Sequence, residues 1–229
     1  MNALAIDCSV SKISIAAKSD MNMAKLTLDI GIRQSEKLLP AIDFVCKELN
    51  LEAKDLDYTA LTLGPGTFTG LRLGMSALKA INLAYNVPCY AVPSLEVYAH
   101  PYARSLETVL SLIEAKEDEF FYAFFVRGEK LRAEEDKSIE DILKQIDPET
   151  SVLACGPSAK NFVERVNEIT PLYTIHDFSP ENDGCESLFE IAEEMIKDKK
   201  KPLHDYDGPL YVRKSEAEIV LEKKQSAQS

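Results

Sequence analysis

The sequence predicts an α/β protein of two lobes. Three observations favour this fold class: the chain has two strand-rich stretches, alternating helices and strands follow each of them, and the net charge changes between them. Hydrophobic residues make up 45% of the 229-residue chain, which provides for sizeable cores and argues against wholesale disorder. We expect an N-terminal α/β lobe over residues 1–104 and an acidic C-terminal α/β lobe over residues 105–229.

The first part of the chain combines short alternating segments with two longer helical patterns. In the first helical pattern, around Leu38–Leu49, Ser35 is the expected N-cap, and Pro40 predicts a later start or a bend because proline lacks an N–H. The other expected elements are strands Ala3–Asp7, Lys12–Ala17 and Ala24–Ile30, strand Tyr58–Leu63, helix Thr67–Tyr85, strand Cys89–Val92 and helix Ser94–Arg104.

The second part begins with strands again and then alternates. The expected elements are strands Thr108–Ile113, Phe120–Arg127 and Lys130–Glu134, helix Ser138–Ile146, strand Val152–Cys155, helix Ser158–Glu168, strand Leu172–Ile175 and helix Gly184–Lys199. Sequence similarity between the two parts is too weak to indicate a repeat.

Charge and cysteine content limit the classes of function. The net charge is −12, and all of it falls after Arg104, because the first 104 residues carry equal numbers of acidic and basic side chains. No basic face is evident, which disfavours solitary RNA binding. The neutral first part suits a protein-binding surface or reflects composition alone. The scattered cysteines and the lack of a long apolar run predict a cytoplasmic protein with reduced thiols and no membrane contact.

The segment LTLGPGTFTGLRLG sets glycines between a strand and a helix. It lacks the lysine of a Walker loop, and Thr69 stands where the dinucleotide fingerprint needs its third glycine. A backbone contact with phosphate around Gly66 and Thr67 stays open, because a helix N-terminus attracts anions. The residues for such a nucleotide contact are Asp7, Ser9, Gly64, Gly66 and Thr67. For Asp7 the alternative is a strand-end carboxylate that caps the next turn.

The helix that follows is apolar over roughly two-thirds of its circumference, which predicts cover on two sides. Gly70 and Gly74 lie on one stripe, and glycine inside a helix costs about 1 kcal/mol relative to alanine, so close approach of another backbone is expected. That neighbour is a partner or, alternatively, this chain itself. We expect leucine at either glycine to abolish complex formation and to leave the monomer folded.

The same glycine segment resembles the GPGSFTGLR[IL]G motif of the bacterial TsaB (YeaZ) family of tRNA threonylcarbamoyladenosine biosynthesis proteins. LAIDCSVSKISIAA resembles the family's opening strands, and GPLYVRKSEAE its closing P-x-Y-[LV]-R. RQSEKLLPAI resembles H-S-E-x-L-L-P with Gln34 in place of histidine. VLSLIEAKEDEFFYAFF resembles I-D-A-R-x-x-E-V-Y, with Glu114 and Lys116 at the aspartate and arginine positions.

The resemblance implies an actin/Hsp70/sugar-kinase-like (ribonuclease H-like) fold and a non-catalytic subunit. It implies a TsaD-like catalytic paralogue and a TsaE-like ATPase as partners, tRNA contact only through the complex, and a homodimer as an alternative when the chain is alone. No cofactor is implied, with ATP or ADP at a subunit interface left open. The implied partner-interface residues are Leu38, Leu39, Ile42, Gly66, Phe68, Gly70, Leu71, Gly74, Met75 and Leu78.

No catalytic or metal-ligating set is evident from the residues. The paralogue holds its metal with a His-x-x-x-His pair, which places two imidazoles on one helix face. Here His100, His176 and His204 are far apart, and each is expected on a surface or loop. Glu114 and Glu117 do not by themselves define an acid/base pair. The alternatives are an independent ATP-dependent phosphotransferase that uses Asp7, and a peptidase, for which no nucleophile–base set is evident.

Overall fold

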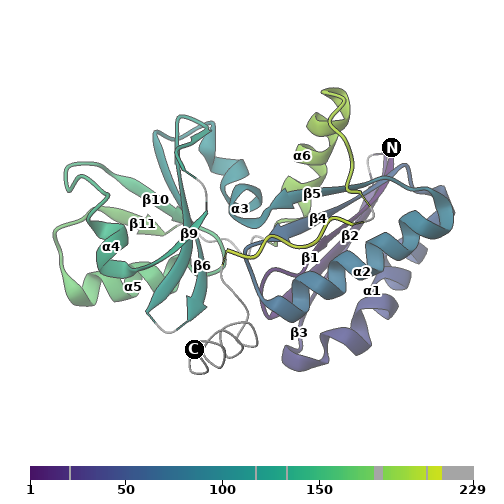
Figure 1. Ribbon diagram of the computed structural model, residues 1–229, viewed down its shortest axis with the longest axis horizontal. Coiled ribbons are helices and arrows are strands. Elements are labelled where there is room, and N and C mark those ends of the chain that lie inside the picture. The colour runs from purple at the N-terminus through teal and green to yellow at the C-terminus, as the bar shows by residue number, and fades with distance from the viewer. Residues whose placement is uncertain (21, 117, 133, 178–182, 205, 213–229) are drawn as a thin grey trace, which may run out of the picture.

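The protein has two lobes, each built on one β-sheet (Figure 1). The computed structural model describes residues 1–20, 22–116, 118–132, 134–177, 183–204 and 206–212. The first sheet contains β1 (Asn2–Asp7), β2 (Lys12–Ser19), β3 (Asn22–Asp29), β4 (Tyr58–Gly64) and β5 (Cys89–Pro93). The second contains β6 (Thr108–Lys116), β7 (Glu119–Val126), β8 (Glu129–Lys130), β9 (Glu135–Ser138), β10 (Val152–Cys155) and β11 (Ile175–Asp177). The helices are α1 (Gln34–Glu48), α2 (Phe68–Tyr85), α3 (Ser94–Ala103), α4 (Ile139–Leu143), α5 (Ala159–Ile169) and α6 (Cys185–Lys197), with 3₁₀ turns at Gly31–Arg33 and Ala53–Asp55.

Both sheets follow one strand order. The first runs β3-β2-β1-β4-β5, with β1–β3 antiparallel and β4 and β5 parallel to β1. In the second, β6 takes the place of β1 between antiparallel β7 and parallel β10, and β11 pairs with β10. This is the ribonuclease H-like arrangement, present twice as in actin, Hsp70 and sugar kinases, so the predicted fold class is confirmed.

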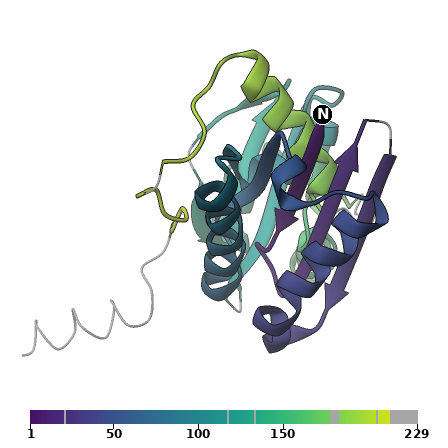
Figure 2. The same ribbon diagram turned by 90° about the vertical axis from the view of Figure 1, so that its right-hand side faces the viewer.

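The first sheet is buried on both faces. Alternating side chains of β1, such as Leu4 and Ile6, pack with α1 and α2 on one side, and Ala3 and Ala5 pack with α6 on the other. Figure 2 shows α1 and α2 together on one face of this sheet. Two-sided burial explains why β1 reads as a continuous apolar run rather than as strict alternation.

The second sheet is also covered on both faces. Its core with α4 and α5 includes Phe120 and Phe162, whose rings meet edge to face at 5.3 Å. The other face packs on α3 through Leu95, Tyr98 and Ala99. Because α3 also contacts β4, β5 and α6, this helix joins the two lobes.

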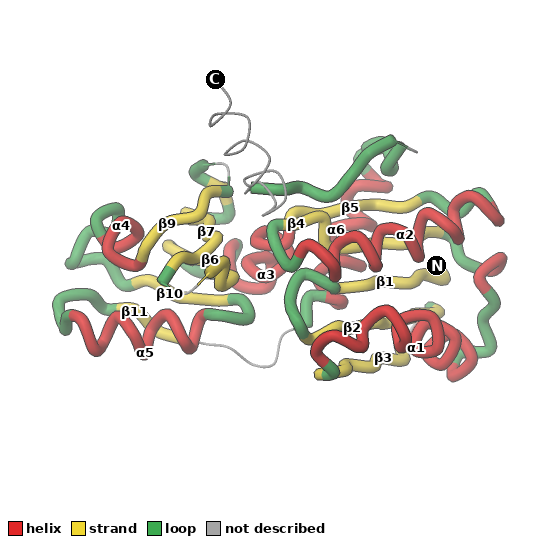
Figure 3. Tube along the Cα trace, turned by 60° about the horizontal axis from the view of Figure 1, so that its bottom comes forward, coloured by secondary structure: helices red, strands yellow, loops and turns green. Residues whose placement is uncertain are grey.

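The chain returns to the first lobe after β11. Helix α6 packs on the first sheet, and the segment after it, here called the C-terminal strap (residues 202–204 and 206–212), runs back along β5 (Figure 3). The Leu203 N–H donates to Cys89 O at 2.7 Å, and the Leu210 N–H donates to Leu63 O at 2.8 Å. The predicted lobe boundary between residues 104 and 105 therefore stays a prediction. Although α6 and the strap follow that boundary in the sequence, they lie against the first sheet.

Several predicted boundaries were wrong. The first long helix begins at Gln34 with no side-chain cap, so Ser35 is not its N-cap, and it continues through Pro40. Its tertiary contacts therefore offset the hydrogen bond that proline removes. Of the described residues in the expected strand Lys130–Glu134 only Lys130 is in a strand, at the end of β8, and β9 begins after it at Glu135; strand Leu172–Ile175 is shifted to Ile175–Asp177. The closing-motif residues 213–218 lie outside the described residues. In the described part of the chain, none of the helices could cross a membrane.

Candidate functional site

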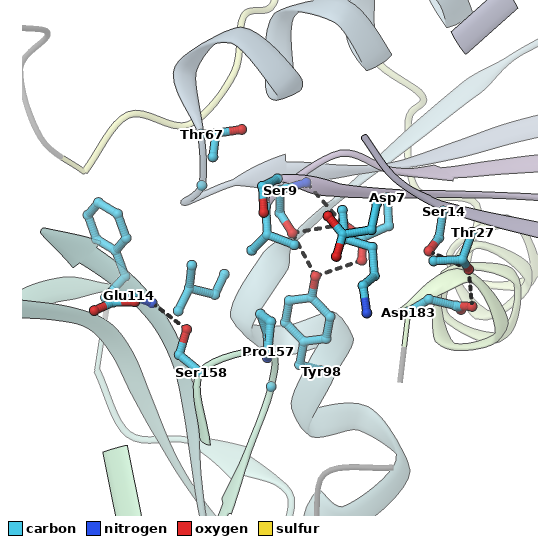
Figure 4. A pocket seen from close by; sticks show the side chains of 18 of the residues that line it. Asp7, Ser9, Ser14, Thr27, Thr67, Tyr98, Glu114, Pro157, Ser158 and Asp183 are labelled. Atoms are coloured by element: carbon cyan, nitrogen blue, oxygen red, sulfur yellow. Dashed lines mark hydrogen bonds between the residues drawn. The ribbon is translucent and has the colours of Figure 1, made fainter. Parts of the chain in front are cut away.

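A cleft of about 780 Å³ lies between the lobes. Its first-lobe wall comes from the β1–β2 turn, β3 and the start of α2, its floor from α3, and its second-lobe wall from β6 and the turn before α5 (Figure 4). The residues that line the cleft include Asp7, Ser9, Gly66, Thr67, Tyr98, Glu114, Ser158 and Asp183.

The carboxylate of Asp7 is hydrogen-bonded on both oxygens. Its Oδ1 accepts from the Ser9 N–H at 3.1 Å, from Ser9 Oγ at 2.8 Å and from Thr62 Oγ1 at 3.1 Å. Its Oδ2 accepts from the Tyr98 hydroxyl at 2.6 Å. The hydrogen bond from the Ser9 N–H caps the turn that follows β1. Such a capping role is the alternative that the sequence analysis gave for Asp7.

Burial sets the protonation behaviour of this cluster. Asp7 is 3% exposed, and burial raises its pKa above the usual value even though four hydrogen bonds oppose the shift. Burial and the adjacent Asp7 charge also raise the pKa of Tyr98 well above its usual value, so the phenol stays a donor. The cluster ties β1, β4 and α3 together, and it leaves Asp7 with little capacity to meet a ligand.

The glycine turn before α2 packs directly on the β1–β2 turn. A Cβ at Gly66 would meet Ser9 O at 2.3 Å, so only glycine allows this approach. The Thr67 N–H donates to Ser9 O at 2.7 Å and is therefore engaged within the chain. The structure brings Asp7, Ser9, Gly66 and Thr67 together at the cleft, whereas Gly64 instead lies under Leu210 of the strap.

The second-lobe wall of the cleft is organised around Glu114. Its N–H donates to Ser158 Oγ at 2.7 Å, and its carboxylate accepts from Asn161 Nδ2 at 3.4 Å and lies 3.7 Å from Arg165 Nη1. Arg165 also pairs with Asp118. Both partners of the Glu114 carboxylate come from α5, so Glu114 links β6 to α5.

Gln34 has a structural role where the resembled motif carries histidine. It is buried at the start of α1, and its side-chain amide donates to Val10 O at 3.2 Å and also to Ser11 O. These bonds fix α1 to the β1–β2 turn. The first lobe's wall of the cleft is thus held by both α1 and α2.

The glycine stripe of α2 faces the chain itself, which corrects one expectation. A Cβ at Gly70 would lie 2.2 Å from Cys8 O, and one at Gly74 would lie 3.4 Å from Cys8 Sγ. Close approach is indeed the reason for Gly70, but the neighbouring backbone is that of Cys8. Leucine at Gly70 would disrupt the fold, so the expectation of a folded monomer that lacks only its partner is wrong for this position.

Most of the predicted interface residues are buried in the first lobe. Leu38, Ile42, Leu71, Met75 and Leu78 belong to its core. Leu39 and Phe68 stay exposed, at 65% and 40%. Further large side chains exposed on α1 and α2 are Phe44, Leu83 and Tyr85, which the sequence analysis did not single out. Helical period alone predicts an apolar arc, but which part of that arc the sheet covers depends on how the helix is oriented.

Outside the cleft, the structure yields little that could act chemically. His100 lies within α3 rather than in a loop, is half-buried, and has its Nε2 3.1 Å from Glu190 Oε2. Within the described residues no group of three or more His, Cys, Asp or Glu side chains could hold a metal ion. Sequence reasoning missed Tyr98 and Thr62, whose role depends on elements far apart in the chain.

Comparison with known proteins finds a matching family model and relatives that carry a functional name. Residues 32–179 match the family model described as TsaD, tRNA N6-adenosine threonylcarbamoyltransferase. A protein of Buchnera aphidicola named "tRNA threonylcarbamoyladenosine biosynthesis protein TsaB" is 27% identical over 56% of this chain and 62% of its own length. The Escherichia coli protein of that name is 22% identical over 95% of this chain and 96% of its own. The chain thus spans less than two thirds of the Buchnera relative.

Among solved structures, YeaZ from Pseudomonas aeruginosa is similar to this chain. The two superpose with a TM-score of 0.76 at 22% identity, over 92% of this chain and 99% of that one. At this identity the likeness establishes a shared two-lobed fold.

Proposed function

The chain belongs to the TsaD family, in the branch of the proteins named TsaB or YeaZ, and on this premise we propose that it is a non-catalytic subunit in tRNA threonylcarbamoyladenosine biosynthesis. It binds and stabilises a TsaD-type catalytic paralogue and supports a TsaE-type ATPase. The complex transfers a threonylcarbamoyl group to N6 of the adenosine at tRNA position 37. The tRNA meets this chain only within that complex.

The observation that carries the docking role is the exposed apolar face of α1 and α2. Leu83 is 85% exposed and Phe44 is 49% exposed, although both lie on helices whose opposite sides are in the core. The two helices lie together on one face of the sheet, and large exposed apolar side chains on both of them are typical of an interaction surface. Of the predicted interface residues, Leu39 and Phe68 belong to this face, and the buried ones support it from below.

The internal hydrogen bonding of the cleft supports a non-catalytic role. A phosphotransferase of this fold would direct a carboxylate and helix-terminal N–H groups at its nucleotide. Here Tyr98, Ser9 and Thr62 donate hydrogen bonds to the Asp7 carboxylate, and the Thr67 N–H donates to Ser9 O. No further observation favours the phosphotransferase alternative or the peptidase.

Reconstitution tests the proposal. Purified paralogue, ATPase, tRNA and threonylcarbamoyl-adenylate with ATP are incubated with and without this chain, and modified adenosine is measured by mass spectrometry. We expect modification to depend on the chain. Full-rate modification in its absence contradicts the proposal. Titration calorimetry with ATP and magnesium on the isolated chain tests the phosphotransferase, which requires binding that Asp7→Ala abolishes.

A further inference from the structure

Three side chains form an exposed stack at the beginning of α2. The Phe68 and Tyr211 rings stack at 5.2 Å, and the Arg72 guanidinium carbon lies 3.6 Å from the Phe68 ring centroid. Arg72 Nε donates to the Tyr211 hydroxyl at 2.7 Å. The guanidinium therefore has one face on an aromatic ring and its Nε–H fixed, which leaves its two terminal NH₂ groups for another acceptor.

The strap holds this arrangement in place. The Leu210 N–H bonds to Leu63 O, and Val212 packs on the cluster between α3 and the second sheet, so Tyr211 is held from both sides. Phe68 and Arg72 occupy adjacent turns of α2, on the same helix as Leu83. The three side chains of the stack are thus held within the chain, and little side-chain entropy remains to be lost there on binding.

Arg72 differs from Arg104, Arg127 and Arg165 in its electrostatics, and it is held in place by aromatic contacts. Arg104, Arg127 and Arg165 each pair with a carboxylate. Arg72 is exposed, and across the described ranges its contacts are aromatic rings and a hydroxyl, with no carboxylate ion pair. In a chain of net charge −12, a fixed cation without a counter-ion is suited to an anion supplied from outside.

We propose that the Phe68–Arg72–Tyr211 stack is an anchor of the docking face that receives a carboxylate of the partner protein. This inference rests on the proposed function and deepens it. Asp or Glu of the partner accepts two parallel hydrogen bonds from the free NH₂ groups of Arg72, while apolar side chains of α1 and α2 exclude water around the pair. Arginine and tyrosine are enriched among the residues that contribute most of the binding energy at protein interfaces.

A protein carboxylate fits better than an RNA phosphate. Nucleic-acid binding needs several cations along a backbone path, and the first 104 residues carry no net positive charge. The side chains that contact Arg72 are aromatic, which suits the core of a protein interface.

The test measures binding of the full chain to the TsaD-type paralogue by titration calorimetry. Arg72→Glu is expected to weaken binding about 100-fold, and Arg72→Lys about tenfold because lysine cannot form the fork. Tyr211→Phe, which keeps the stack and removes the Nε acceptor, is expected to weaken binding about threefold. Each variant's thermal unfolding midpoint is measured, and the midpoint is expected to be unchanged because Arg72 is exposed.

The matched control is Arg127→Gln, which removes an exposed arginine of the other lobe and should leave affinity unchanged. If replacing one acidic residue of the paralogue by lysine restores its binding to the Arg72→Glu variant, the carboxylate contact is supported. If Arg72→Glu binds the paralogue with wild-type affinity, the carboxylate contact is wrong. If Arg72→Glu binds the paralogue normally but its complex no longer binds tRNA, Arg72 contacts a phosphate instead, which also overturns the proposal. Failure of the unmodified chain to bind the paralogue instead removes the proposed function itself.

Discussion

The two lobes share a strand order but differ in their outer surfaces. On the second lobe the outward side of α5 carries charged residues such as Lys160 and Glu164, which face each other at i and i+4. On the first lobe α1 and α2 present Leu39, Phe44 and Leu83 to solvent. The comparison teaches that packing preserves the sheet order in both lobes, whereas the outer helix faces differ, with a charged pair on α5 and exposed large apolar side chains on α1 and α2.

The cleft walls differ in the same way. On the first lobe Asp7 is buried and tied to α3, and on the second lobe Glu114 is exposed and tied to α5. Asp7 is the last residue of β1, and burial raises its pKa above the usual value, whereas Glu114 lies two residues before the end of β6 with its side chain exposed. The central strands of the two sheets therefore place their carboxylates in different surroundings, one buried and one exposed. The five predictions below test this comparison.

The largest effect is expected in the second-lobe core. Phe162→Ala removes a fully buried ring that meets Phe120 edge to face, and it should lower the free energy of unfolding by about 4 kcal/mol. Because α3 packs on both sheets, chemical denaturation should show one transition, with hydrogen exchange accelerated in both lobes. Loss of protection confined to the second lobe would show that the lobes unfold independently.

The two helix glycines of the first lobe should respond differently. Alanine at Gly70 places a Cβ 2.2 Å from Cys8 O and should lower the free energy of unfolding by about 3 kcal/mol. Gly74→Ala is the matched control, since its Cβ makes ordinary contacts and gains helix propensity, and it should change stability by less than about 1 kcal/mol. Urea denaturation measures both. Equal effects at the two sites contradict the close contact with Cys8.

Removing the Tyr98 hydroxyl should loosen the connection between the lobes. Tyr98→Phe leaves Asp7 Oδ2 without its donor inside the protein, at a cost of about 2 kcal/mol in the free energy of unfolding. Tyr122→Phe is the control, because its hydroxyl accepts a hydrogen bond from Gln145 within the second lobe and does not join the two lobes. Unchanged stability of Tyr98→Phe in thermal and urea denaturation would mean that the hydroxyl does not stabilise the cluster.

The buried Asp7 should give the protein a pH dependence that Asp7→Asn lacks. The folded-state pKa of Asp7 lies above the ordinary 3.8, so the folded protein holds the proton more tightly than the unfolded chain. This contribution is fully present below pH 3.8 and is lost as pH rises through the folded-state pKa. The wild-type free energy of unfolding, measured relative to Asp7→Asn by urea titrations, should therefore fall as pH rises. If the wild type instead gains stability relative to Asp7→Asn as pH rises, the hydrogen bonds lower the pKa of Asp7 more than burial raises it.

The smallest effect on stability is expected at the docking face. Leu83→Ser alters a side chain that is 85% exposed, and it should change the free energy of unfolding by less than about 0.5 kcal/mol. Affinity for the TsaD-type paralogue should nevertheless fall about tenfold or more, because an apolar contact is lost. Leu172→Ser on the second lobe, also exposed, is the control. Undiminished binding by Leu83→Ser would exclude this side chain from the docking face.

The sequence by itself determined the α/β class, the order of most elements and the tight turn before α2. Periodicity predicted α2 over Thr67–Tyr85 and β10 over Val152–Cys155 nearly to the residue, because long or strongly patterned segments carry their own signal. The packing of Gly70 on Cys8, the association of Asp7 with Tyr98, and the return of the strap to Arg72 were decided by the tertiary structure. These contacts join residues 62, 91 and 139 positions apart, and local pattern holds no information about which distant backbone or side chain will meet a given face.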